Sequence, residues 1–96
     1  MSPNKKKKLK NLRKELDLLD DSFIKIIKKR TILVKKVLSL KEYKNQIIDR
    51  KRINIILKNV KKKSIKNNID PIITKRIWKN MIWSYINFEK RNFKKK

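Results

Sequence analysis

Two cations continue the apolar stripe of the first helix that the sequence predicts. Val34 and Val37 are spaced as neighbours on one helical face. Arg30 lies one turn before this pair and Lys41 one turn after it. The two cations are 11 residues apart, which places them about 20° apart around a helix, on one face. Because an amphipathic helix normally keeps charge on its opposite face, we expect both to face an anion.

Other charged residues lie on or beside predicted apolar faces. Arg52 stands one turn before Ile56, Glu89 continues a stripe after Tyr85, and Arg13 lies at the edge of the first stripe. Each one alone is also explained by an internal ion pair or by snorkelling to the rim. Together, however, the cations outnumber the acids on these faces, and an unpaired buried charge is costly. Several arginines and a lysine suit a small dicarboxylate ligand, because Arg binds carboxylates bidentately.

Composition excludes most other site chemistry. The chain has no Cys, His or Gly, so we expect no disulfide, no metal site, no glycine-rich phosphate loop and no cofactor. It also lacks an apolar run of about 18 residues and a secretory signal, so we expect a cytoplasmic protein with no membrane association.

The net charge of +23 suggests nucleic acid as a partner. However, 25 Lys, 16 Ile and 10 Asn together are what A/T-rich codons would produce by drift. We therefore interpret most lysines as a solvated background and the six arginines as more informative. A recognisable helix-turn-helix and aromatics interleaved with the basic runs are also missing. A basic helical nucleic-acid-binding protein remains the hypothesis from a different class.

The periodicity predicts an all-α fold of three helices in one domain, 1–96. The first helix runs from an N-cap at Ser2 to about residue 41, and residues 42–48 form a connection. The second helix begins after Asp49 as N-cap. The third runs from Pro71 to about residue 93, after a break at Asn68 and Asp70. We expect the basic residues 1–8 to fray, because they oppose the positive end of the helix dipole, and residues 94–96 to form a basic tail.

The length of the first helix predicts an assembly. It would be about 57 Å long, whereas a small domain is only about 30 Å across. Two helices of roughly 20 residues do not cover such a stripe, so we expect a homodimer in which the long helices pack on each other. The alternative is a flexible N-terminal extension.

Four segments resemble the all-helical (type II) chorismate mutases. Arg30 follows Arg13 by 17 residues and Lys41 follows Arg30 by 11, the spacings of that family's first helix. The second helix begins with a similar Asp-x-x-Arg pattern, and the resemblance covers residues 9 to 92. The segments are LRKELDLLDD (12–21), KKRTILVKKVLSLK (28–41), DRKR (49–52) and NIDPIITKRIWKNMIWSYINFE (68–89).

The resemblance implies an intertwined homodimer with two active sites, each lined by both chains. It assigns Arg13 (from the partner chain), Arg30 and Arg52 to the two carboxylates of chorismate. Lys41 and Glu89 would hydrogen-bond the ether oxygen of the breaking bond. Asp49 would order the start of the second helix and the hydroxyl side of the pocket. The implied reaction is the conversion of chorismate to prephenate in phenylalanine and tyrosine biosynthesis, an isomerase reaction without a cofactor.

Three departures from the family pattern leave an alternative open. Ile53 stands where many relatives have Glu, Tyr85 stands where relatives often have Ser, and the connection from Lys41 to Asp49 is one residue short. Ile53 and Tyr85, the latter a candidate substrate-binding residue, are also similar to features of isochorismate-pyruvate lyases, which share the fold. These enzymes form salicylate and are the second hypothesis.

Overall fold

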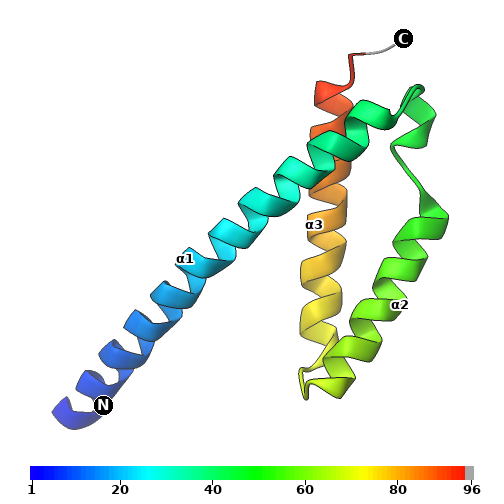
Figure 1. The fold of residues 1–96 in the computed structure, drawn as a ribbon. Helices are drawn as coiled ribbons and strands as arrows, with labels where there is room; N and C mark the ends of the chain where they lie inside the picture. Colours follow the sequence, from blue (N-terminus) through cyan, green and yellow to red (C-terminus); the bar gives the residue numbers. More distant parts are fainter. Residues whose placement is uncertain (95–96) are drawn as a thin grey trace. The chain divides into compact units, whose positions relative to one another are not determined.

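A computed structural model of the chain describes residues 1–94, which form three α-helices and one short 3-10 helix (Figure 1). The helices are α1 (Pro3–Leu40), α2 (Arg50–Lys66) and α3 (Pro71–Asn92), and the 3-10 helix is η1 (Lys44–Gln46). Within these residues there is no strand. The predicted all-α class, the three helices and their order are confirmed.

The ends of the helices lie where the capping residues predicted them. The hydroxyl of Ser2 accepts a hydrogen bond from the backbone N–H of Lys5 at 3.2 Å, just before α1. Asp49 and Asp70 are the N-caps of α2 and α3. Asn68 has a φ of 57°, the left-handed conformation that Asn adopts more readily than most residues. Short polar side chains therefore determine each of these boundaries locally.

The connection between α1 and α2 is more ordered than expected. It contains η1, which the hydrophobic pattern did not predict. The Gln46 side-chain oxygen accepts hydrogen bonds from the backbone N–H groups of Glu42 at 2.7 Å and Tyr43 at 2.9 Å. A polar side chain, which carries no periodicity signal, thus closes this turn.

The chain divides into two compact units, Met1–Leu33 and Val34–Lys96. The first unit is a continuous stretch of α1 in which the apolar side chains are exposed, apart from the half-buried Leu9. Leu12 and Leu16 are each 57% exposed, Leu19 is 65% exposed and Phe23 is 49% exposed. The fraying expected at residues 1–8 stays a prediction, and the structure has these residues helical from Pro3 onward.

The second unit contains the core. α2 and α3 run side by side in opposite directions, joined by the short turn after α2 (Figure 1). Leu38, Ile47 and Ile86 are buried together. At the other end of the pair, the Ser64 and Thr74 hydroxyl oxygens are hydrogen-bonded at 2.6 Å. The residues predicted to face inward from α2 and α3 are all buried or half-buried: Ile53, Ile56, Leu57, Val60, Trp78, Met81, Ile82, Tyr85 and Ile86.

Lys94 is exposed after α3, and the rest of the predicted basic tail, Lys95 and Lys96, lies outside the described residues. In the part that the structure describes, no helix has the length and apolar character needed to cross a membrane.

Candidate active site

An ion pair inside the second unit joins two of the predicted site residues. Lys41 directly follows α1, and Glu89 lies in the last turns of α3. The Lys41 ammonium nitrogen is 3.1 Å from the Glu89 carboxylate oxygen Oε1. The side chains are only 19% and 7% exposed, so the predicted inward position of both is confirmed. In this arrangement Lys41 donates and Glu89 accepts, which leaves two further N–H groups of Lys41 for a ligand.

Lys41 also lines a pocket of about 780 Å³ that is rich in cations. The pocket is formed by the end of α1, the η1 turn, the start of α2 and the end of α3. Its charged lining comprises Lys41, Lys44, Arg50 and Lys90 with one acid, Asp49. The N-terminus of α2 contributes a further partial positive charge. Four cations against one carboxylate make this pocket suitable for an anion.

Asp49 has a structural role that the geometry defines. Its carboxylate oxygen Oδ1 accepts a hydrogen bond from the backbone N–H of Arg52 at 3.0 Å, as an N-cap does. The same side chain lines the pocket. Asp49 therefore couples the start of α2 to the pocket wall, and its contact with a ligand hydroxyl stays a prediction.

Arg52 does not face inward, which corrects the sequence prediction. It is exposed, whereas the adjacent Ile53 is half-buried and packs against the core. Arg52 lies in the first turn of α2, where side chains lean back toward the helix N-terminus and beyond the packed part of the helix. Spacing relative to Ile56 therefore did not predict its burial, and its binding to a carboxylate stays a prediction.

Arg30 and Arg13 belong to the first unit, Met1–Leu33. Arg30 is half-buried, as predicted, and its Nε is buried without a hydrogen-bond partner among the described residues. A buried N–H without an acceptor destabilises the chain, so this atom needs an acceptor. Arg13 is exposed and lies beside Lys10 and Lys14 along a shallow pocket on α1.

Tyr85 is half-buried on α3 and does not line the cation-rich pocket. Its ring packs edge-to-face on Phe88, with centroids 6.5 Å apart and an interplanar angle of 88°. The role of Tyr85 in substrate binding stays a prediction.

Three pocket cations, Lys44, Arg50 and Lys90, were missed by sequence reasoning. The sequence contains 25 lysines, and neither Lys44 nor Lys90 differs in type or spacing from the others. Arg50 directly follows the predicted site residue Asp49, and this position in the sequence was the feature that could have identified it as a pocket residue. Among residues 1–94, no group of three or more acidic, His or Cys side chains is placed to hold a metal ion.

Comparison with known proteins gives one finding on the family. The family model described as chorismate mutase type II matches residues 12–90. No curated protein and no solved structure matches the chain significantly. The match extends over most of the chain, so the chain belongs to the chorismate mutase type II family. The matched range contains all the predicted site residues: Arg13, Arg30, Lys41, Asp49, Arg52, Tyr85 and Glu89.

Proposed function

We propose that the chain catalyses the rearrangement of chorismate to prephenate, a step in phenylalanine and tyrosine biosynthesis. The observation that carries the proposal is the half-buried Lys41 ammonium on the wall of a cation-rich pocket. Membership of the chorismate mutase type II family supports the same reaction. Chorismate carries two carboxylates and an ether oxygen, and these are the groups that such cations bind.

The reaction fits a site without a nucleophile. One C–O bond breaks and one C–C bond forms within a single molecule, so no metal or cofactor is needed. The enzyme has to hold the compact conformer of the substrate and stabilise the negative charge that develops on the ether oxygen. Lys41 would donate a hydrogen bond to that oxygen through an N–H that Glu89 does not use.

The remaining candidates would bind the ends of the substrate. Arg13, Arg30 and Arg52 would hold the two carboxylates, because the guanidinium fork matches a carboxylate bidentately. Arg30 supports this role best, since its buried Nε has no acceptor among the described residues. Asp49 would accept a hydrogen bond from the ring hydroxyl at the start of α2.

We further propose that the active molecule is a homodimer whose sites are shared between chains. The exposed leucines of α1 support it, because a regular apolar stripe in water is unfavourable for an isolated chain. Arg13, itself on this half of α1, would then reach the site of the partner chain. Size-exclusion chromatography with light scattering at micromolar concentration tests this, and a monomer mass would contradict it.

Isochorismate-pyruvate lyase activity is the second candidate, and one observation favours it. Ile53 packs against the core and so presents no polar group to a ring hydroxyl. Without a polar contact to the ring hydroxyl, the site would discriminate less between chorismate and isochorismate. The two functions differ in substrate and in products.

A single comparison tests both candidates. Purified protein is given chorismate or isochorismate, and substrate loss is followed by absorbance with the products identified. We expect prephenate from chorismate and little turnover of isochorismate. Salicylate and pyruvate from isochorismate, without prephenate from chorismate, would replace the first candidate by the second. No turnover of either would reject both.

A further inference from the structure

One side of α2 is open to solvent along the whole helix and is dominated by cations. This exposed face comprises all eight Lys and Arg residues of α2 together with Asn54, Ile55, Asn59 and Ile65. The helix contains no Asp or Glu, whereas α1 contains four acidic residues and α3 contains one. None of the eight cations forms an ion pair with another residue in the described part of the chain, 1–94. The positive charge of the exposed face is therefore uncompensated.

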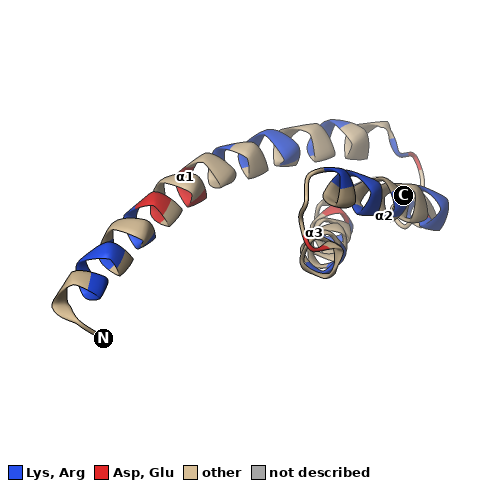
Figure 2. Cartoon of the chain, turned by 90° about the horizontal axis from the view of Figure 1, so that it is seen from below, with Lys and Arg blue, Asp and Glu red and all other residues tan. Residues whose placement is uncertain are grey.

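The cations are concentrated in two groups that repeat along the helix. Residues 50–52, RKR, begin α2, and residues 61–63, KKK, lie near its end. The groups are 11 residues apart, which places the second about 16 Å further along the helix and only about 20° around it. Figure 2 shows them as blue segments at the two ends of α2. The helix therefore presents the same pattern of positive charge twice.

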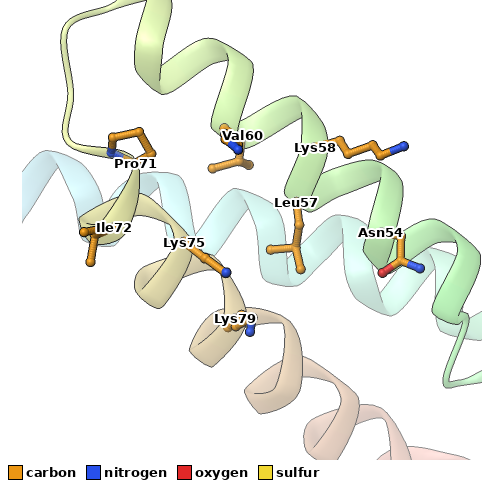
Figure 3. Close-up of a pocket in the computed structure, with 9 residues that line it drawn as sticks. Asn54, Leu57, Lys58, Val60, Pro71, Ile72, Lys75 and Lys79 are labelled. Atoms are coloured by element: carbon orange, nitrogen blue, oxygen red, sulfur yellow. The ribbon is translucent and has the colours of Figure 1, made fainter.

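The apolar side of α2 is used inside the second unit. Ile53, Leu57 and Val60 are half-buried. Figure 3 shows Leu57 directed from α2 toward α3, whereas the adjacent Lys58 extends away from α3. A helix that lies in a membrane surface needs its apolar side free to enter the lipid. Because α2 packs that side on the rest of the unit, its exposed face suits a polar, anionic partner better than a bilayer.

A regular polyanion has the chemistry that this face would bind. Each strand of a nucleic-acid duplex carries one phosphate about every 3.4 Å along the axis. Lys, Arg and Asn side chains are common donors to phosphate oxygens. At about 25 Å in length, α2 would lie along roughly seven base pairs. Binding of a single strand relies on bases that stack on aromatic side chains, and α2 has none.

We infer that the exposed face of α2 binds the phosphate backbone of double-stranded nucleic acid without reading its sequence. The absence of a helix-turn-helix argues only against the reading of base pairs, since backbone contacts need no such motif. Lys58, Lys62 and Lys66 follow one another at intervals of four residues and form a row on this face. None of the three belongs to the candidate active site, so this binding does not depend on the proposed rearrangement.

Neutralising the row provides the test. The variant carries Lys58→Gln, Lys62→Gln and Lys66→Gln, which keep helix propensity at exposed positions, and circular dichroism verifies its fold. Fluorescence anisotropy with a labelled duplex of mixed sequence measures Kd at several salt concentrations. At about 50 mM salt, we expect binding at least about tenfold weaker than that of the wild type, and a slope of log K against log salt that is shallower by about 2 to 3.

The matched control removes three charges from exposed positions of α1: Lys25→Gln, Lys28→Gln and Lys29→Gln. Its net charge equals that of the α2 variant, so its Kd and its salt dependence should stay close to those of the wild type. Equal losses in the two variants would overturn the inference, because net charge and not the α2 face would then govern binding. A wild-type chain that binds no duplex at low salt would overturn it as well.

Two further measurements define the partner. Unlabelled duplexes of unrelated sequence should compete equally, and a strong preference for one sequence would contradict backbone binding. Sedimentation with vesicles of equal parts phosphatidylserine and phosphatidylcholine tests the lipid alternative. If the α2 variant loses vesicle binding while its duplex binding matches that of the wild type, the face belongs to lipid headgroups and the inference is wrong. The variant Lys58→Arg, Lys62→Arg and Lys66→Arg should bind duplex like the wild type, since it keeps the charge.

Discussion

At the scale of single residues, Arg30 combines partial burial with an Nε that has no hydrogen-bond partner among the described residues. A group that belonged to a structural ion pair would have its acceptor within the fold. A buried group that binds a ligand lowers the stability of the free chain, because its N–H has no acceptor. The ligand supplies that acceptor when it binds. The two roles predict opposite effects of truncation on stability.

We therefore expect Arg30→Ala to lower kcat/KM by about 100-fold or more while the melting temperature holds or rises. Steady-state kinetics and thermal unfolding by circular dichroism measure the two effects. Arg76→Ala, which removes an exposed arginine of α3, is the control and should change neither. A large loss of thermal stability with activity intact would make Arg30 a structural residue.

Glu89 has two possible roles toward the substrate. In the structure it accepts a hydrogen bond from Lys41, and a carboxylate has no proton to donate. Donation to the ether oxygen from this position requires an N–H or O–H group, which the amide of Gln would supply. The competing hypothesis is that Glu89 only pairs with Lys41 and orients its ammonium group.

We expect Glu89→Gln to retain most of the activity, because an amide can accept a hydrogen bond from Lys41 and also donate one to the ether oxygen. Steady-state kcat/KM is the measurement, with Glu42→Gln, an exposed position, as the control. A large loss of kcat/KM in Glu89→Gln alone would show that the negative charge of Glu89 is needed to hold Lys41 and that Glu89 acts only through Lys41.

At the scale of the helices, two aspartates make the same local interaction at different places. Asp49 caps α2 through the N–H of Arg52 at 3.0 Å, and Asp70 caps α3 through the N–H of Ile72 at 2.9 Å. Only Asp49 lines the cation-rich pocket. Comparing variants of Asp49 and Asp70 therefore distinguishes the effect of losing a helix N-cap from the effect of losing a pocket residue.

Replacing either aspartate by Ala should lower the free energy of unfolding by about 1 kcal/mol, the usual value of an N-cap. Urea denaturation measures this loss. Asp49→Ala should also reduce kcat/KM at temperatures where the protein is fully folded, and Asp70→Ala should not. Equal activities of the two variants would restrict Asp49 to its capping role.

At the scale of the whole molecule, the shared site has a direct test. Arg13→Ala and Lys41→Ala should each be nearly inactive, since they remove different cations from every site. In an exchanged dimer, a site that takes Arg13 from one chain and Lys41 from the other can be complete. Mixing the two variants under conditions of subunit exchange should therefore restore up to about a quarter of wild-type activity, because half of the dimers are mixed and one of their two sites is intact.

Exchange itself is verified by native mass spectrometry of chains with different tags. If mixed dimers form and no activity returns, each site lies within one chain. The control is each variant alone, carried through the same exchange procedure, and it should stay inactive.

The local features of the fold were predictable from the sequence. Hydrophobic periodicity predicts the three helices, and the short polar residues Ser2, Asp49 and Asp70 together with Asn68 predict their ends, because each of these interactions joins residues only a few positions apart. Arg30 and Lys41 are half-buried, as their spacing from Val34 predicts, although Lys41 lies just beyond the end of α1 and Val37 is exposed. The family follows from the ordered set of charged residues and is shown by the family model.

Only the tertiary structure decided which charges meet. Lys41 and Glu89 are 48 residues apart, and their ion pair exists because the end of α1 packs beside the end of α3. The same packing gathers Lys44, Arg50 and Lys90 around one pocket and leaves Arg52 in solvent. Periodicity specifies which face of a helix is apolar, but contact between two side chains depends on which faces of different helices pack and where each helix ends.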